Sequence, residues 1–457
     1  MSRLRANEAG APVRAMRVWG AAVLIYVIAV AGRTSFGVAG VAATERFGLG
    51  AGELAGFVVV HMAVYALAQI PVGLLLDRIG PRHMLGWGAL LLAVGQAALA
   101  FAPTFGWALA ARVAVGLGDA TAFVSVVRLI PAWFAPRRVP LFTQLTSLIG
   151  QLGPIVSAVP FLAILLRSGW GAAFVSLAAT GVLVSLLGFL AIRDAPAGES
   201  PTVKREPVGD ILASVVRNPG TWLGFFTHFT LMFSANVFLI LWGMPLLTLG
   251  QGYSTATAAA LISINSLAGI VAGPLIASAI VRHPMQRSSL VLALIAVTAA
   301  SWLIVLVGGD VRPVWMWAAH VVVLACAGAG SSIGFDIART SLPAHHFGTA
   351  SGLVNMGGFI SSIVTAQAIG FILDALRPAG DFTASDFRVA LAVQIPIALI
   401  GVGGILLSRA KARSRLAASG VYPLTTSQVV ARVLRVDKRL RARAEAGQTR
   451  ARKDGDR

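Results

Sequence analysis

The stretch that decides the fold reads G-L-L-L-D-R-I-G-P-R, from Gly73 to Arg82. Apolar runs lie on both sides of it, at residues 54–76 and 84–102. Glycine lets two helices approach closely, and the Gly80-Pro81 pair favours a tight turn. An aspartate at a helix end, here Asp77, can pair with a basic residue of a neighbouring helix. An ordinary basic loop does not need this order of residues, so the pattern predicts a specialised turn between two apolar helices.

The composition extends this reading to the whole chain. Of the 457 residues, 57% are hydrophobic and 12% are charged, with a mean hydropathy of +0.80. A soluble domain carries about 25% charged residues, and a membrane-spanning helix uses about 20 apolar residues. The chain can therefore supply about a dozen spans. This excludes a soluble enzyme, a secreted disulfide scaffold and a disordered protein, and the long unbroken apolar runs exclude an outer-membrane barrel.

The apolar runs predict an all-α integral membrane protein with twelve transmembrane helices in two six-helix pseudo-repeats. The predicted spans are 18–42, 54–76, 84–102, 106–132, 140–166, 170–192, 221–248, 255–280, 288–307, 314–338, 348–376 and 386–408. The expected parts are a basic N-terminus (1–17), an N-terminal bundle (18–192), a polar central linker (193–220), a C-terminal bundle (221–408) and a basic tail (409–457).

Basic residues predict the orientation of these spans. With the N-terminus inside, the inner side receives Arg and Lys in pairs and the outer side receives them singly, which places both termini in the cytoplasm. Residues 409–457 hold 14 Lys and Arg but 4 Asp and Glu. This segment therefore carries more than half of the net charge of +19. We expect this tail to contact anionic lipid headgroups and no nucleic acid.

The two predicted halves resemble each other in several details. Arg128 is followed by Pro131 in the fourth span, and Arg339 is followed by Pro343 at the end of the tenth, where Asp336 and Arg339 suggest a gate pair. Two repeats joined by a polar linker are typical of a rocking transporter. The alternative is a polytopic enzyme or scaffold. The sequence contains no HExxH motif, Walker loop or recognisable metal-ligand cluster, so we expect neither a cofactor nor a metal.

Three charges fall deep within predicted spans: Arg33 in the first span, and Arg112 and Asp119 in the fourth. A charge at this depth costs about 2.5–3.5 kcal/mol on insertion scales and should face a bundle interior or water. Arg112 and Asp119 are about two helical turns apart and so share one face. They either carry function or pair to hold helices together.

The Gly73–Arg82 stretch resembles the signature G-x-L-x-D-R-x-G-R-R of the major facilitator superfamily, with Pro81 at one Arg position. In that family the motif is a cytoplasmic latch that stabilises the outward-facing state. The resemblance covers essentially all twelve spans. It implies gating roles for Gly73, Asp77, Arg78, Gly80 and Arg82. From their positions in the chain, we expect a gating role for Arg128, Asp336 and Arg339 as well.

The fourth span, from Arg112 to Ala120, resembles the R-x-x-x-G-x-G-E-A segment of the anion:cation symporter family, with Asp119 in place of Glu. The first span from Arg33 to Ala39 and the second-span segment from Tyr65 to Gly73 are also similar to that family. Its members carry sugar acids and other carboxylates, often with protons. The resemblance implies that Arg33 and Tyr65 bind the anion, and that Asp119 with Arg112 couples protons. Gly32 stands where that family often has a second acidic residue.

Weaker polar signals complete the predicted site. His61 and His228 could titrate near neutral pH or could be packing residues. Asn236 and Asn355 could line the C-terminal half of a cavity or join helices.

The sequence as a whole predicts a monomeric, proton-coupled secondary transporter of a small organic anion in the inner or plasma membrane. The alternatives are proton-driven efflux of a lipophilic compound, transport of nitrate or nitrite, and a non-transporting receptor or scaffold. The nitrate alternative is less favoured, because the sequence lacks the glycine- and asparagine-rich signature of nitrate porters.

Overall fold

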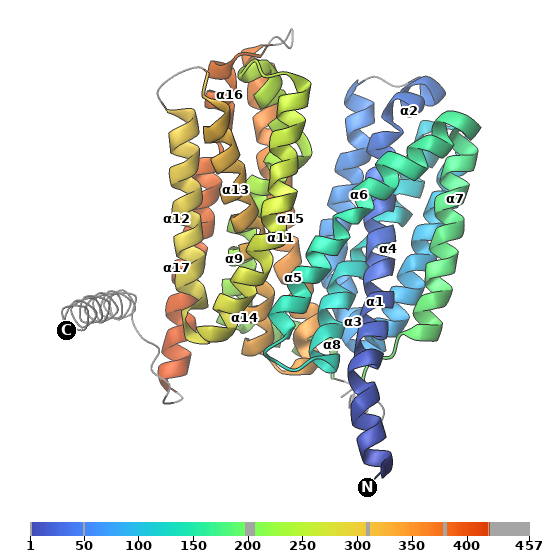
Figure 1. The fold of residues 1–457 in the computed structure, drawn as a ribbon, viewed down its shortest axis with the longest axis vertical. Helices are drawn as coiled ribbons and strands as arrows, with labels where there is room; N and C mark the ends of the chain where they lie inside the picture. Colours follow the sequence, from blue (N-terminus) through green and yellow to red (C-terminus); the bar gives the residue numbers. More distant parts are fainter. Residues whose placement is uncertain are drawn as a thin grey trace, which may run out of the picture.

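The computed structural model describes residues 2–48, 51–196, 206–307, 311–377, 382–418 and 420. All regular elements within these ranges are helices (Figure 1). The first half holds α1 (Ser2–Val38), α2 (Gly40–Phe47), α3 (Ala51–Ala100), α4 (Phe105–Trp133), α5 (Val139–Gly150), α6 (Leu152–Val156) and α7 (Leu162–Ala191). The remainder holds α8 (Val208–Arg217), α9 (Pro219–Val237), α10 (Gly243–Pro245), α11 (Thr255–Arg282), α12 (Arg287–Leu306), α13 (Val314–Ser331), α14 (Ile333–Ser341), α15 (Phe347–Leu376), α16 (Ala384–Leu391) and α17 (Gln394–Ala418).

Nine helical segments of the described ranges are long and apolar enough to cross a membrane. Two of them, Val59–Ala100 and Val139–Ala191, have 42 and 53 residues, whereas one crossing needs about 20. Each contains a glycine with a non-helical backbone, Gly80 at φ 79° and Gly169 at φ 81°. These breaks fall between predicted spans, as the Gly80-Pro81 turn requires. The predicted all-α class is confirmed.

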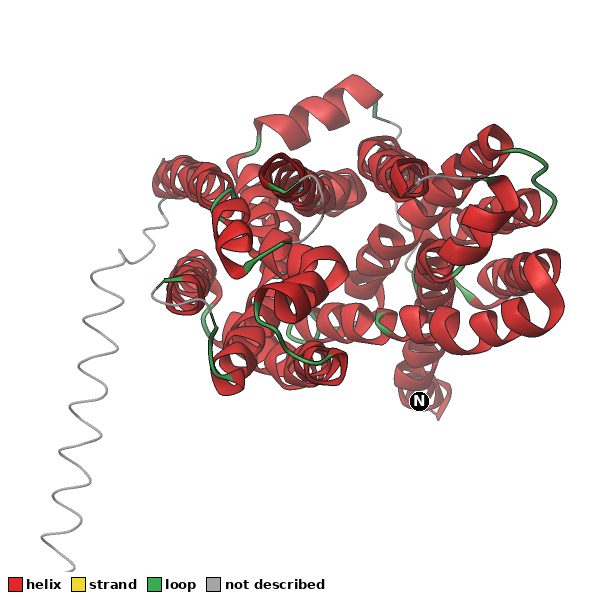
Figure 2. Ribbon diagram, turned by 90° about the horizontal axis from the view of Figure 1, so that it is seen from above, coloured by secondary structure: helices red, strands yellow, loops and turns green. Residues whose placement is uncertain are grey.

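The helices form two side-by-side bundles, α1–α7 and α9–α17 (Figures 1 and 2). The bundles meet mainly where α3 packs on α15 and α5 packs on α11. In Figure 1 they converge at the end that carries the N-terminus and diverge at the end that carries α2 and α16. Buried apolar clusters fill each bundle, and two further clusters join them, one around Phe123 and Phe335 and one around Tyr65 and Phe359.

The contact between α3 and α15 depends on small residues. A Cβ atom added at Gly73 would lie 2.7 Å from the carbonyl oxygen of Gly348 and 2.7 Å from the Cα of Thr349. Only glycine leaves room for the two backbones to touch there. The sequence therefore places α3 and α15 in direct contact at the converging end of the molecule.

The predicted linker contains a helix that the sequence interpretation did not anticipate. Within its described part, α8 buries Ile211 and Val215, and α9 begins at Pro219, slightly before the predicted 221. The side chain of Asn218 accepts a hydrogen bond from the backbone of Gly220, which fixes this helix start. Helix α1 also begins within the predicted basic N-terminus, at Ser2. Residues 421–457 of the predicted basic tail lie outside the described residues.

Candidate functional site

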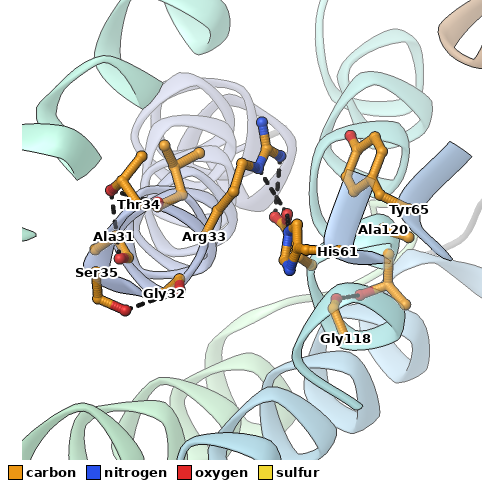
Figure 3. A network of polar contacts seen from close by, with 12 residues as sticks. Ala31, Gly32, Arg33, Thr34, Ser35, His61, Tyr65, Gly118 and Ala120 are labelled. Atoms are coloured by element: carbon orange, nitrogen blue, oxygen red, sulfur yellow. Dashed lines mark hydrogen bonds and ion pairs between the residues drawn. The ribbon is translucent and has the colours of Figure 1, made fainter. Parts of the chain in front are cut away.

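The site centres on an ion pair between α1 and α4. Arg33 Nε lies 2.7 Å from Asp119 Oδ2, and Arg33 Nη2 lies 3.0 Å from Oδ1, so the guanidinium fork binds both carboxylate oxygens (Figure 3). The Asp119 side chain is fully buried, whereas 20% of the Arg33 side chain is exposed. Such a bidentate pair is strong and geometrically specific. Arg33 therefore reaches accessible space while Asp119 holds it from the bundle interior.

A third side chain joins this pair. His61 on α3 places Nε2 3.1 Å from Asp119 Oδ2, within hydrogen-bond distance, and is itself buried (Figure 3). The sequence interpretation gave His61 a packing role or a titrating role without placing it. The structure puts its imidazole directly on the Asp119 carboxylate. A proton that reaches this carboxylate can thus be shared with a neighbouring base.

Arg112 does not form the hydrogen-bonded pair with Asp119 that their shared helix face suggested. Its guanidinium donates to the backbone carbonyls of Gly32 and Arg33, over 3.2 and 3.3 Å, and stacks 5.3 Å from the ring centre of Phe36. Helical spacing placed Arg112 and Asp119 on one face correctly, but it could not reveal that Arg33 enters from the neighbouring helix. Arg112 positions α1, and Arg33 is the hydrogen-bonded partner of Asp119.

The network continues into the second half of the molecule. The Arg33 guanidinium carbon lies 4.7 Å from the ring centre of Tyr65 and 5.6 Å from that of Phe359 on α15. Asn355, also on α15, donates to the Tyr65 hydroxyl and to Gln69 Oε1, both over 3.0 Å. The predicted binding residues Arg33, Tyr65 and Asn355 therefore come together at the interface between the two bundles.

The other two predicted binding residues make contacts within the second half. His228 Nδ1 lies 3.2 Å from the carbonyl oxygen of Ser331 on α13, and Asn236 donates to Ser362 Oγ on α15 over 3.4 Å. Both side chains thus join α9 to its neighbours. The sequence left open a packing role for His228 and a helix-joining role for Asn236, beside roles in binding.

Asp77 bridges the two halves at their converging end. Its carboxylate accepts hydrogen bonds from the backbone nitrogens of Gly348 and Thr349 and from the Thr349 hydroxyl, each over 2.7 Å. These donors form the start of α15, where the helix dipole favours a negative charge. Arg128 of α4 adds an ion pair, with Nε 3.6 Å from Asp77 Oδ1. The sequence pattern predicted the basic partner but not the cap on α15.

The remaining residues of the Gly73–Arg82 stretch act inside the first half. The Gly80 turn, with its positive φ, lies against Asp194, whose Oδ1 accepts from the backbone nitrogen of Arg82 over 2.7 Å. The Arg82 guanidinium donates to the carbonyl oxygen of Phe189 over 2.7 and 3.0 Å. Arg82 therefore ties α3 to the end of α7, while Arg78 is exposed. The contacts of Arg82 thus lie within the first half, whereas the resemblance implied a latch between the halves.

The gate pair predicted at Asp336 and Arg339 is formed, with 2.5 Å between Asp336 Oδ1 and Arg339 Nη2. Arg287 joins it, with Nε 2.9 Å from Asp336 Oδ2. All three residues belong to the second half. A further cross-half contact, besides that of Asp77, is made by Gln144 of α5, which donates to Ser332 Oγ over 2.6 Å. Sequence reasoning missed Gln144, because an isolated glutamine carries no signal.

A second polar group lies away from the central site. Glu206, His345 and His346 place their ligand atoms within 4.8 Å of one another. The sequence contains no recognisable metal-ligand motif, and it is the fold that brings these three side chains together. Glu206 and His346 are separated by 140 residues in the chain, so no motif spacing could reveal them. The adjacent pair His345-His346 was the available signal.

Two bundles of membrane-length helices meet around buried charges, which is the arrangement expected of a membrane transporter. The sequence matches the family model described as "Major Facilitator Superfamily" over residues 22–366 of its 457, and the chain belongs to that superfamily. This membership confirms the predictions of a transporter, of a non-enzymatic protein and of a multi-pass protein of the inner membrane.

Curated relatives extend the comparison. The chain is 27% identical over 225 residues to a protein of Escherichia coli (strain K12) named "Probable L-galactonate transporter". The aligned region covers 49% of this chain and 48% of that protein. It is 26% identical over 364 residues to "Probable nitrate/nitrite transporter NarK2" of Mycobacterium tuberculosis, with 77% and 86% covered. The chain thus spans about half the length of the L-galactonate relative. These names support the resemblance to anion:cation symporters.

Solved structures share the fold. A crystal structure of a bacterial homologue of the iron transporter ferroportin, in an outward-facing state with soaked iron, aligns with a TM-score of 0.68 at 14% identity. The alignment covers 86% of this chain and 99% of that one. At this identity the likeness concerns the fold alone.

Proposed function

We propose that this protein is a secondary active transporter that moves a small organic anion by proton-coupled alternating access. The observation that carries the proposal is the buried Arg33–Asp119 pair at the interface between the two halves. We further propose twelve crossings with both termini in the cytoplasm, the glycine breaks in α3 and α7 separating consecutive spans. One chain contains every residue of the site, so a monomer suffices.

The proposed coupling is an exchange of partners on Arg33. When Asp119 is ionised, it neutralises the guanidinium. A proton on Asp119 removes that charge and leaves Arg33 to bind the carboxylate of an entering anion. Arginine suits this step because its planar fork binds carboxylates through two hydrogen bonds. His61 contacts the same carboxylate and offers an alternative proton acceptor.

This exchange prevents uncoupled cycling. A site with protonated Asp119 and no anion would leave Arg33 without a compensating charge, and breaking a buried pair in this way costs about 3–5 kcal/mol. With either Asp119 ionised or an anion bound, Arg33 is neutralised. The carrier can therefore change conformation in these two states and is penalised in the state that would leak protons.

The Asp77 cap on α15 provides the latch of this cycle. It closes the converging end, which carries the N-terminus and which we propose to be cytoplasmic, so the conformation is the outward-facing one. Charge-assisted hydrogen bonds to the Gly348 and Thr349 backbone contribute about 1.5–3 kcal/mol each. Opening this end requires α3 and α15 to separate, which breaks these bonds and exposes the site to the cytoplasm.

A sugar acid or a similar carboxylate is the proposed substrate class. Relatives carry the names of transporters for L-galactonate, sulfoacetate and galactarate or D-glucarate, all of them organic anions. Tyr65 and Asn355 lie beside Arg33 and offer hydroxyl and amide groups to a polar substrate. Asn236 and His228 would line the second half of the path after rearrangement.

Nitrate or nitrite is the second candidate. The matches named as nitrate/nitrite transporters include one that covers 77% of this chain, a broader coverage than that of the L-galactonate relative. The ion pair of Arg33 with Asp119 favours the organic anion, because a substrate carboxylate matches the geometry of the Asp119 side chain that it displaces.

A thermal-shift screen of the purified protein tests the function. Carboxylates, sugar acids, nitrate and phosphate esters are compared, and a ligand at 100 times its Kd should stabilise the protein by about 2.7 kcal/mol. Arg33→Ala serves as the control and should remove the shift. A sugar acid that stabilises wild type but not Arg33→Ala supports the proposal. Stabilisation by nitrate alone favours the second candidate, and equal shifts in both proteins contradict an anion site at Arg33.

A further inference from the structure

A compact group of metal-ligating side chains lies outside the central site. Glu206 stands just before α8, and His345 and His346 close the short turn η5 (Ala344–His346) that leads into α15. The His346 Nε2 atom lies 2.8 Å from Glu206 Oε2, and His345 Nε2 lies 3.3 Å from Glu206 Oε1. The three side chains thus converge on one point from two distant segments of the chain.

We propose that Glu206, His345 and His346 bind a divalent transition-metal cation, with Zn²⁺ as the best fit. Their ligand atoms all lie within 4.8 Å of one another. Ligand atoms around a tetrahedral zinc ion lie about 3.3 Å apart, given metal–ligand distances of about 2.0–2.1 Å. Small side-chain rotations therefore suffice to place a cation between them.

The donor set selects the type of metal. Two imidazole nitrogens and one carboxylate are ligands that zinc, copper and nickel accept, whereas magnesium and calcium prefer oxygen ligands. Three protein ligands leave a fourth position for water.

The surroundings support a built site. His346 Nδ1 lies 3.1 Å from Ser214 Oγ of α8, so with a metal on Nε2 this nitrogen carries the hydrogen and donates to the hydroxyl. Such an outer partner fixes the tautomer and the ring orientation of a ligating histidine. The His346 side chain is 6% exposed, whereas Glu206 and His345 are 31% and 35% exposed. One ligand is thus anchored inside, and a cation can enter from solvent.

The position of the site suggests what the cation would do. His346 lies two and three residues before Gly348 and Thr349, which bind Asp77. A bound cation would tie the segment before α8 to the start of α15 and hold that start in the geometry that Asp77 caps. The cation would therefore stabilise the conformation with this end closed and would slow its opening.

Calorimetric titration of the full-length protein with Zn²⁺ tests the proposal, after removal of any affinity tag and any bound metal. Wild type should bind one equivalent. The double variant His345→Ala/His346→Ala should lose at least 100-fold in affinity, and Ser214→Ala about 10- to 100-fold, as expected for an outer partner. His283→Ala removes an exposed histidine from another loop and should bind like wild type.

A second measurement separates a metal site from a hydrogen-bonded cluster. Zn²⁺ should raise the melting temperature of wild type and of His283→Ala but leave that of Glu206→Gln nearly unchanged, while all three melt alike in chelator. Absence of Zn²⁺ binding to wild type, or equal binding by the double variant, would overturn the proposal and leave the three residues as a hydrogen-bonded cluster. Because no transported substrate enters these measurements, their result is independent of the proposed anion transport.

Discussion

Asp119→Asn removes the charge at the centre of the proposed coupling while keeping the size of the side chain. In wild type, Asp119 occupies both arms of the Arg33 fork, so an anion must displace it. Asparagine keeps one oxygen acceptor but mimics the protonated carboxyl. Arg33 then lacks its compensating charge, and an entering anion becomes its strongest partner.

The size of the effect follows from the burial of the pair. Loss of one member of a buried ion pair costs about 3–5 kcal/mol, and each 1.4 kcal/mol corresponds to a factor of ten in affinity. Because 20% of the Arg33 side chain is exposed, water recovers part of this energy. We therefore expect the variant to bind the anion about 10- to 100-fold more tightly than wild type at a pH where Asp119 is ionised. Its melting temperature without anion should fall.

Two assays measure the effect on folded protein. Calorimetry with the anion found in the thermal-shift screen should give a wild-type affinity that weakens as pH rises, because an ionised Asp119 competes for Arg33. The affinity of Asp119→Asn should be much less dependent on pH. In proteoliposomes the variant should lose accumulation driven by a pH gradient but retain counterflow without a gradient. Asp386→Asn, which breaks the Arg377 pair near α16, is the matched control and should behave like wild type.

Accumulation of substrate by Asp119→Asn on a pH gradient would refute this reasoning and move the proton site to His61 or His228. Loss of both transport modes in folded protein would instead make Asp119 a structural partner of Arg33. An affinity with the pH dependence of wild type would show that Asp119 does not compete with the anion.

Three further predictions follow from the same contacts. Arg33→Ala should abolish anion binding, and Arg33→Lys should lose most of it because one ammonium cannot form the two-armed contact; near-normal affinity of Arg33→Ala by calorimetry would contradict the anion site. Asp77→Asn should shift the resting population toward the proposed inward-facing state, measured as the distance between spin labels at the diverging ends of the predicted spans 18–42 and 221–248; an unchanged distribution would exclude the latch. Gly73→Ala places a Cβ 2.7 Å from the Thr349 Cα and should produce the same shift by forcing α3 and α15 apart. A label distribution like that of wild type would show that the contact between α3 and α15 accommodates the extra methyl group without separating.

The fold was largely predictable because it depends on patterns that local sequence contains. Apolar runs mark the helices, and the positive φ at Gly80 falls within the turn that Gly80-Pro81 indicates. Helix α8 was harder to foresee, since a short amphipathic helix in a polar linker resembles the linker in composition. The exact start of α9 depends on a single cap at Asn218.

The site was predictable by residue but not by pairing. Charges at membrane depth identified Arg33, Arg112 and Asp119 as unusual, because burial of a charge needs a reason. Which arginine meets the aspartate depends on how α1 packs on α4, and spacing along one helix carries no information on this. The same limit hid the His61 contact and the convergence of Glu206 on the histidine pair. These contacts join residues that are far apart in the chain.

The contacts between α3 and α15 form one antiparallel seam that links the central site to the latch. Tyr65 meets Asn355 beside Arg33, Gly73 touches Gly348 and Thr349 further along, and Asp77 caps α15 at the end. Both helices are continuous over these segments, so the seam can open at one end only if strain or rotation is accommodated at the other. A change of partner on Arg33 alters the surroundings of Tyr65, and thereby the cross-half bond to Asn355. In the proposed cycle, anion binding at the centre and release of the Asp77 cap would both act through this packing contact, and we propose it as the physical path of alternating access.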